Sequence, residues 1–364
     1  MDLADVNAAA PPDTALFERT TKADTSCNPP IAFVPVWYTN YAETFIGTVV
    51  PLVELEDRKV LNYSTTTVIA DVLHKHLPRG VCRSGITRRC TMTSWFRGFV
   101  SLAAQRLRFM HELAQPTCFS HFRFCQLRSM FDNQPKGVDA WASAQRLVER
   151  VLGDAAAPSP DTSGELRVLI ERRYGGLGLR GRSSKVLRNV GALLDACKRE
   201  SVLKLRCRPY SFGNASLEED MRAVRWADVL VGMHGAGLTN AYFMRQRSAL
   251  VEVRPFGFEG RWPDAYYQNI LRLAAVPRIF HLTLSIGTPE LCHPNVGLAV
   301  TPQTASYAAS CALPWAGLRK ALTRVAWWRG GEKPEERYLG SAFYGKNVVA
   351  YDEEKEATGR PDVL

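Results

Sequence analysis

The second half of the chain alternates short apolar runs with amphipathic stretches. Strand-length apolar runs lie at 166–171, 201–207, 228–233, 249–253 and 278–284, and the run at 278–284 is predicted to be the last strand. Helices are predicted over 185–198, 216–226, from 237, over 266–274 and over 313–328. Ser216 and Glu219 have the spacing of a capping box at the start of one of them. Strands that alternate with helices predict a parallel, doubly wound sheet.

The first half shows fewer regular patterns. An apolar run at 31–36 predicts a buried strand, and a helix is predicted over 40–53. Residues 139–152 predict an amphipathic helix, because the apolar positions recur on one face. The following segment, 153–164, is small, polar and Pro-rich, and predicts a linker between two domains.

Composition supports a folded chain of two domains. Of 364 residues, 46% are hydrophobic and 23% are charged, which is typical of globular proteins. No apolar run reaches the roughly 18 residues of a membrane helix. The acidic, Ala- and Pro-rich start lacks the basic flank and apolar stretch of a secretory signal, so we expect a cytosolic chain or one without its true N-terminus.

Cysteines and sequons do not decide between an oxidising and a reducing compartment. The nine cysteines include no CxxC pair, which argues against a zinc ribbon or a thioredoxin-type motif. Nine cysteines suit a few disulfides plus one free thiol, and suit a reduced protein equally well. Sequons at Asn62 and Asn214 favour the secretory side slightly.

The stretch at 227–243, ADVLVGMHGAGLTNAYF, carries the most chemical information. An apolar strand runs directly into His234 and Gly235, and a helix is predicted to open from Gly237. Such a turn presents helix-start N–H groups at the carboxyl end of a parallel strand, and glycines let ligand oxygens approach the backbone. The pattern predicts a phosphate or diphosphate site. The alternatives are a tight turn whose glycines serve packing, and a His234 that is structural and donates to no diphosphate oxygen.

These residues resemble the signature of the family-61 glycosyltransferases. That family includes plant xylan-decorating xylosyl- and arabinosyltransferases and animal protein O-GlcNAc transferases of the secretory pathway. Residues 170–173 resemble its strand followed by Ser-Arg, with Glu171 in place of Ser. Residues 185–189 resemble its Arg-x-Ile-x-Asn element, with Lys185 in place of Arg, and 251–253 resembles its acidic strand end. The resemblance is strong over about 165–285, weaker over 30–155 and absent at both tails.

The resemblance implies an α/β, GT-B-like fold of two Rossmann-like domains, with a doubly wound parallel sheet in the C-terminal one. It implies inverting transfer of a sugar from a UDP-sugar to a glycan or glycoprotein in the Golgi or ER lumen, with no cofactor and no bound metal. The absence of an Asp-x-Asp pair agrees with the last point. The expected order is a flexible N-terminus (1–26), an acceptor-side domain (27–152), a linker (153–164), a nucleotide-sugar domain (165–285), C-terminal helices and loops (286–352) and a flexible tail (353–364).

The resemblance also implies site residues. The donor-binding set is Arg172, Arg173, Asn189, Gly232, His234, Gly235, Ala236, Gly237, Leu238, Thr239, Asn240 and Glu252. In this set Arg172 would neutralise phosphate charge, the turn would hold the diphosphate, and Glu252 is a candidate for the ribose hydroxyls. The alternative for Arg172 and Glu252 is an ordinary ion pair at the sheet edge.

The N-terminal half departs from the family pattern. Asn40 fits on the acceptor side, but Glu43 stands where a His is expected and Gly47 where an Asp is expected. An inverting transferase needs a general base for the acceptor hydroxyl. Glu43 is the candidate catalytic base if burial raises its pKa; otherwise it is a surface glutamate.

Three rival hypotheses remain open. The missing His and Asp suit a transferase-fold binding protein that has lost its base. A GxGxxG at 176–181 suits an NADP-dependent oxidoreductase. Nine arginines over 79–128 suit an anionic partner, but no nucleic-acid module is recognisable there, and we expect no nucleic-acid binding. In a transferase the same basic stretch would meet an acidic glycan or a membrane surface.

Overall fold

The chain separates into two compact units, Met1–Arg150 and Val151–Leu364, in a computed structural model. The structure describes residues 30–33, 41–59, 61–70, 101–103, 105–109, 123–125, 140–153, 164–173, 185–213, 215–258, 267, 278–293, 309–340 and 347–350. The predicted flexible ends at 1–26 and 353–364, most of the linker at 153–164, the GxGxxG and most of the helix at 266–274 lie outside the described residues.

The first unit contains a four-stranded parallel sheet in the order β3-β2-β1-β4. Its strands are β1 (Pro30–Phe33), β2 (Thr67–Ala70), β3 (Arg106–Phe109) and β4 (Arg123–Cys125). In the central strand, Ile31 pairs with Val68 on one side and Arg123 on the other. A strand is therefore confirmed over the first part of the predicted 31–36 run.

One continuous helical run follows, made of α1 (Tyr41–Thr44), a π-helical segment η2 (Phe45–Val49) and α2 (Val50–Asp57). It confirms the predicted helix and extends it beyond residue 53. Pro51 explains the π-helical segment, because its ring crowds the carbonyl of Gly47 four residues earlier and it has no N–H to donate. The later helix, α4 (Ala140–Leu152), buries Ala144, Leu147 and Val148 and confirms the amphipathic prediction.

The second unit is built on a six-stranded parallel sheet in the order β12-β9-β8-β7-β5-β6. The strands are β5 (Leu166–Glu171), β6 (Leu205–Tyr210), β7 (Val229–Met233), β8 (Ser248–Arg254), β9 (Ile279–Ile286) and β12 (Asn347–Ala350). From β5 the chain steps to β6 on one side, then returns to β7 on the other side and continues through β8 and β9 to β12. The sheet is doubly wound, as predicted, and its direction of winding reverses between β5 and β7.

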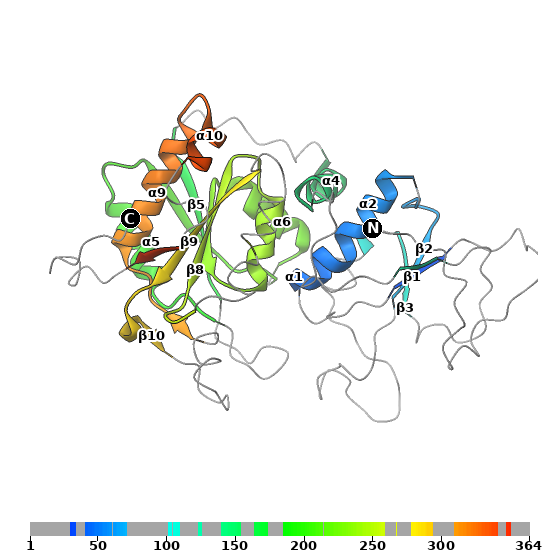
Figure 1. The fold of residues 1–364 in the computed structure, drawn as a ribbon, viewed down its shortest axis with the longest axis horizontal. Helices are drawn as coiled ribbons and strands as arrows, with labels where there is room; N and C mark the ends of the chain where they lie inside the picture. Colours follow the sequence, from blue (N-terminus) through cyan, green and yellow to red (C-terminus); the bar gives the residue numbers. More distant parts are fainter. Residues whose placement is uncertain are drawn as a thin grey trace, which may run out of the picture. The chain divides into compact units, whose positions relative to one another are not determined.

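Helices cover both faces of this sheet (Figure 1). On one face, α5 (Val190–Arg199) and α9 (Trp315–Arg329) close the main apolar core. On the other face lie α6 (Leu217–Trp226) and the 3-10 helix η6 (Ala236–Phe243). Every residue of β7 and β8 is buried, which is typical of strands covered on both sides. The capping box at Ser216 is present, with Glu219 N–H donating to the Ser216 hydroxyl at 3.2 Å.

Two elements begin later than predicted. The helix predicted from 185 begins at Val190, because Leu187 bridges to Cys311 and Asn189 bonds the main chain of Leu313. The strand predicted over 201–207 occupies 205–210 instead. Glu200 Oε1 accepts hydrogen bonds from the N–H groups of Val202 (2.8 Å) and Leu203 (3.3 Å), which holds the preceding residues in a turn.

One further prediction was wrong. β9 is not the last strand, because β12 pairs in parallel with it through Asn347 and Thr283. The helix predicted from Gly237 is present, and it is a 3-10 helix that begins at Ala236. Asn240 Nδ2 donates to the Gly237 carbonyl at 2.8 Å, a local side-chain bond of the kind that competes with α-helical pairing. Short strands β10 (Cys292–His293) and β11 (Ser310–Cys311) pair antiparallel and carry one disulfide; a second disulfide joins Cys197 to Cys207.

Asp228 fixes the amino end of the sheet. Its carboxylate accepts the Arg167 N–H at 2.9 Å and forms ion pairs with Arg167 (3.2 Å), Arg329 (2.8 Å) and Arg245. Burial opposes the negative charge, but Arg329 and Arg167 together hold the pKa of Asp228 below its usual range. One carboxylate thereby joins the starts of β5 and β7 to the end of α9.

We expect Asp228→Asn to lower the free energy of unfolding of this unit by about 3 kcal/mol, since it leaves three guanidinium groups without their shared anion. The melting temperature should fall by roughly 6–12 °C. The contribution should also fade as pH falls below about 4, because the pKa is lower in the folded state. Thermal unfolding monitored by circular dichroism would measure both effects. The matched control is Asp195→Asn, an exposed member of a pair with Lys198; equal losses in the two variants would contradict this role.

Candidate functional site

The candidate site lies at the carboxyl ends of β5 and β7, where the winding direction reverses. Open α/β sheets bind ligands at this position, because the chain leaves the two strands toward opposite faces and opens a crevice between them. The residues that follow β5 include Arg173, and those that follow β7 are His234 and Gly235. The start of η6 meets the same edge of the sheet.

Three glycines make room for two charged side chains. A Cβ on Gly232 would lie 2.5 Å from Glu171 Oε2, and a Cβ on Gly235 would lie 2.5 Å from Arg173 Nη1. A Cβ on Gly237 would overlap the Glu171 carboxylate. Any other residue at these positions would displace the charged pair, so the glycines of the turn are explained by close approach of Glu171 and Arg173.

Glu171 and Arg173 form an ion pair beneath the turn. Arg173 Nε donates to Glu171 Oε1 at 2.9 Å, and Arg173 Nη2 donates to the Met233 carbonyl at 3.3 Å. Glu171 is buried, and its Oε2 has no hydrogen-bond partner among the described residues. Burial raises the pKa of Glu171, with Arg173 acting in the opposite direction.

A chain of three buried side chains lies beside this pair. His234 Nδ1 bonds Glu252 Oε1, and His281 Nε2 bonds Glu252 Oε2 at 2.7 Å. Arg254 Nη2 also donates to Oε2, at 3.3 Å. Burial of Glu252 opposes its charge, but the hydrogen bonds from the two histidines outweigh it and hold its pKa far below the usual range. Glu252 is therefore an ionised carboxylate with no exposed surface.

Aromatic rings enclose His234. The Phe258 ring centroid lies 4.7 Å from that of His234, and the Tyr267 centroid lies 5.9 Å away. Tyr267 donates its hydroxyl hydrogen to the Gly235 carbonyl at 2.7 Å and so supports the turn. His234 keeps 9% of its surface exposed, and burial lowers its pKa.

Lys185 adds a second cation near the turn. Its ammonium group lies 5.1 Å from the centre of the Phe258 ring. Burial, followed by the nearby Arg173 charge, lowers the pKa of Lys185 to about 7. A lysine of this kind gains its full charge when an anion comes close. The site thus combines a helix start, an arginine, a histidine and a lysine, which together suit a phosphate-bearing ligand.

The structure brings some predicted site residues together and separates others. Arg173, Gly232, His234, Gly235 and Gly237 meet at the turn, and Ala236 begins η6. Within η6, Leu238, Thr239 and Asn240 are buried, and Thr239 Oγ1 lies 3.4 Å from the Tyr267 hydroxyl.

The donor-binding roles of Arg172, Asn189 and Glu252 stay predictions. Arg172 is exposed, and its carbonyl accepts the Ser211 hydroxyl at 2.6 Å. Both polar ends of the Asn189 side chain bond the main chain of Leu313, at 2.8 and 3.0 Å. Glu252 has both carboxylate oxygens bonded to histidines below the surface, an environment that differs from that of a ribose-binding carboxylate.

The site predicted from the sequence lacks several residues that lie around the turn and Glu252 in the structure. Lys185 was part of a recognised element but not of the predicted site, and Tyr267, Phe258, His281 and Arg254 were not considered. Of these residues, His281 was the easiest to find from the sequence, because it is a polar residue inside the apolar run that forms β9. Buried polar residues of that kind need a partner from another strand.

The predicted acceptor-side residues lie in the first unit. Glu43 lies in α1, while its side chain, like the whole of Asn40, lies outside the described residues. Gly47 lies in the π-helical segment η2, and a Cβ there would meet no atom within 4 Å. The role of Glu43 as a base stays a prediction.

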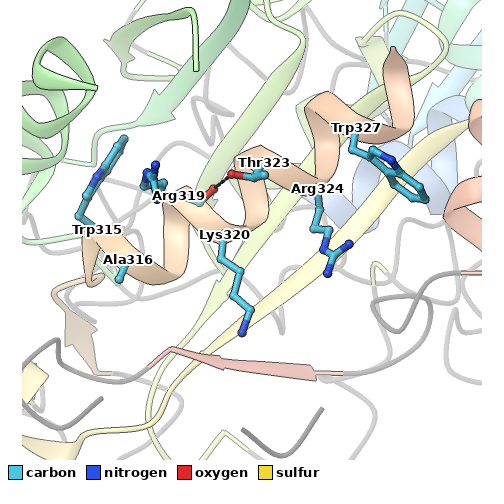
Figure 2. A pocket seen from close by; sticks show the side chains of 7 residues that line it. All are labelled: Trp315, Ala316, Arg319, Lys320, Thr323, Arg324 and Trp327. Carbon is cyan, nitrogen blue, oxygen red and sulfur yellow. Dashed lines mark hydrogen bonds between the residues drawn. The ribbon is translucent and has the colours of Figure 1, made fainter. Parts of the chain in front are cut away.

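A separate hollow follows the exposed side of α9 (Figure 2). Trp315 and Trp327 stand at its two ends, and Arg319, Lys320 and Arg324 lie between them. Arg319 Nε pairs with Glu200 Oε2 at 2.6 Å, which ties α9 to the end of α5. None of these residues belongs to the turn described above.

The family model described as Glycosyltransferase 61 matches residues 26–251, which is more than half of the chain. The chain belongs to glycosyltransferase family 61. The match includes β5, β7, the glycine turn and most of β8, so it confirms the resemblance that those residues carry. No curated protein matches the chain.

One solved structure in the comparison is also a glycosyltransferase. It is the bacterial iron-containing dodecameric glycosyltransferase TibC from enterotoxigenic E. coli H10407, at 12% sequence identity and a TM-score of 0.30. The match covers 65% of this chain and 61% of that one, so the chain spans less than two thirds of the length of this neighbour. In the described part of the family-61 chain, no helix has the length and apolar character needed to cross a bilayer.

Close packing at the turn predicts the effect of a single methyl group. We expect Gly237→Ala to destabilise the second unit by about 1–3 kcal/mol, because the new Cβ overlaps the Glu171 carboxylate. Gly191→Ala in α5 is the control, since a Cβ there meets no atom within 4 Å and should be neutral or stabilising by roughly 0.5–1 kcal/mol. Denaturant unfolding would measure both. In a double-mutant cycle, Glu171→Ala should relieve much of the Gly237→Ala loss; strict additivity would show that the two residues do not collide.

Proposed function

We propose that this family-61 protein transfers a sugar with inversion from a UDP-sugar to a glycan or glycoprotein. The observation that carries the proposal is the convergence of the η6 start, Arg173, His234 and Lys185 at the winding reversal between β5 and β7. Helix-start N–H groups and a guanidinium both suit diphosphate oxygens. The donor diphosphate would lie against Gly235 and Ala236, with its leaving oxygen toward the cations.

The proposed reaction is a single in-line displacement. The acceptor hydroxyl oxygen forms a bond to the anomeric carbon while the bond from that carbon to the diphosphate oxygen breaks, and its electron pair leaves with UDP. The acceptor proton passes to a base, for which Glu43 is our candidate. Arg173 and Lys185 stabilise the charge that develops on the leaving diphosphate, which is the largest electrostatic demand of such a step.

Neither a cofactor nor a metal enters this proposal. Across the described ranges, no group of three His, Cys, Asp or Glu side chains is arranged to hold a metal ion, and metal independence stays a prediction. The cationic side chains at the turn would supply the charge that a divalent ion supplies elsewhere.

We place the protein in the lumen of the secretory pathway. The Cys197–Cys207 and Cys292–Cys311 disulfides support this proposal, because disulfides persist in oxidising compartments. Asn62 of the first sequon is exposed, and its Oδ1 accepts the Ser64 hydroxyl at 2.7 Å. Glycan or glycoprotein acceptors are available in that compartment.

The second candidate is a binding protein of this fold that has lost turnover. Gly47 favours it, because this residue stands where the family pattern has an Asp and carries no side chain that could act as an acid or base. The Glu171 carboxylate lies against Gly232 and Gly237, on the turn where the diphosphate is proposed to bind. An ionised Glu171 would oppose the diphosphate charge and a neutral one would not, so donor binding and turnover need separate tests.

Donor binding is tested by thermal shift with UDP and NADP side by side. At about 100 times its dissociation constant, UDP should stabilise the protein by about 2.7 kcal/mol, or roughly 5–10 °C. Arg173→Ala should weaken UDP binding about tenfold to a hundredfold, because it removes a charge-assisted contact. Arg222→Ala on α6, where the arginine pairs with Glu218 at the surface, should leave the shift unchanged. A shift with NADP alone would contradict the proposal.

Turnover is tested by the anomeric configuration of the product and by Glu43. With a panel of UDP-sugars and glycan acceptors, we expect a product of inverted configuration. Glu43→Gln should lower kcat by about 10²–10⁴-fold while UDP binding persists, because only proton removal is lost. Glu54→Gln in the following helix, where Glu54 pairs with Arg58, is the matched control. Equal kcat values for the Glu43 variant and wild type would remove Glu43 from the mechanism, and UDP binding without turnover would favour the binding protein.

A further inference from the structure

His234 lies between a fixed anion and the proposed position of a second one. Its Nδ1 bonds Glu252, while its Nε2 makes no hydrogen bond within the described residues. His234 follows β7 directly and precedes Gly235, the first residue of the turn that we propose to hold the diphosphate. The inference below rests on the proposed function, because it concerns the diphosphate that we place there.

The first anion, Glu252, is ionised in the empty site and has fixed contacts. His281 Nε2 donates to it at 2.7 Å and Arg254 Nη2 donates at 3.3 Å, and no part of it reaches solvent. An ionised carboxylate only accepts hydrogen bonds, so the Nδ1 atom that faces it must carry a hydrogen. A neutral imidazole has one N–H group, and therefore Nε2 of the unliganded protein carries a lone pair.

An arriving diphosphate oxygen would meet that lone pair. Moving the ring hydrogen to Nε2 would give the diphosphate a hydrogen-bond donor. It would also place the Nδ1 lone pair against the ionised Glu252 carboxylate, which has no hydrogen to donate. Both anions are satisfied only when the pair of side chains gains one more proton, either as a doubly protonated His234 or as a protonated Glu252 beside an Nε2–H ring. The proton count is the same in both cases.

We infer that the His234–Glu252 pair takes up one proton when a diphosphate binds at the glycine turn, with His281 and Arg254 as positioning residues. The empty site holds a neutral ring beside an ionised carboxylate, and in the bound site that pair of side chains holds one more proton. The pair therefore couples donor binding to pH. Affinity should fall about tenfold per pH unit above the pKa of the unliganded ring, since one proton enters with each ligand.

The charged groups that face His234 set this balance. Glu252 favours the protonated ring, whereas Lys185 and Arg254 oppose it, and burial is the largest opposing effect. A diphosphate adds negative charge on the Nε2 side and reverses the balance. Lys185 is a second acceptor of protons in the same site, because its pKa is lowered to about 7. The experiment must therefore separate uptake by His234 from uptake by Lys185.

Isothermal titration calorimetry with UDP at pH 8 measures the uptake directly. The apparent binding enthalpy is measured in Tricine, HEPES and Tris, and its slope against buffer ionisation enthalpy gives the number of protons bound. The terminal phosphate of UDP is ionised at pH 8, because its pKa is about 6. The wild type should take up about one proton more than His234→Gln, whose amide N–H donates to the diphosphate without protonation.

Three further variants complete the test. Glu252→Gln should also lose about one proton of uptake, because its amide can donate to Nδ1 and leave a neutral Nε2–H ring for the diphosphate. Lys185→Met should keep the proton assigned to His234. His293→Gln, an exposed histidine on β10, is the matched control and should equal the wild type. Thermal unfolding confirms that each variant folds, and His234→Gln carries the test if Glu252→Gln does not.

The outcomes are distinct. UDP binding with uptake that both His234→Gln and Glu252→Gln abolish, and with the corresponding loss of pH dependence in UDP affinity, supports the inference. UDP binding without that difference overturns the inference and leaves the proposed donor unchanged. Uptake that only Lys185→Met abolishes assigns the proton to Lys185 and also overturns it. No UDP binding in the wild type would contradict the proposed function itself.

Discussion

The site depends on one constraint, which is that a parallel sheet buried on both faces must pair every polar side chain it carries. Glu252 aligns with Gly232 on one side and Thr283 on the other, so the three share a face of the sheet. Glu171 belongs to the same row, because its neighbour Ile170 aligns with Val231. Two carboxylates thus enter the face that η6 covers, and each needs a counter-charge within reach. Arg173 supplies one, and the histidines with Arg254 supply the other.

Buried carboxylates are paired differently at the two ends of the sheet. At the amino end, Asp228 is surrounded by Arg167, Arg245 and Arg329, and its oxygens are engaged. At the carboxyl end, Glu171 Oε2 and His234 Nε2 have no hydrogen-bond partner among the described residues. Arg245 Nε and Arg329 Nη1 beside Asp228 also have no hydrogen-bond partner among the described residues, so the two ends differ in their carboxylates: the Asp228 oxygens are engaged, and Glu171 keeps one oxygen that could accept a hydrogen bond. The difference agrees with the general rule that open sheets bind at their carboxyl edge.

Much of the scaffold was predictable, because periodicity and end signals are local. The central strands, the capping box at Ser216 and the glycine turn all follow from neighbouring residues. The late start of α5 and the addition of β12 depend on contacts between residues far apart in the sequence, such as Leu187 with Cys311. The sequence also predicts which arginine lies beside Glu171. Side chains alternate beyond a strand end as they do within the strand, so Arg173 shares the face of Glu171 and Arg172 does not.

The charges around the turn explain how an anion site can remain stable when it is empty. Arg173 is neutralised by Glu171, and Arg254 by Glu252, so neither pair leaves a net charge under the turn. The remaining cations are His234 and Lys185, and burial lowers the pKa of both. Burial favours the neutral form of both groups when no anion is present, which reduces the cost of a buried, unpaired cation. Positive charge therefore accumulates at the turn in response to a ligand, and the same burial that depresses the two pKa values strengthens each contact once the anion has entered.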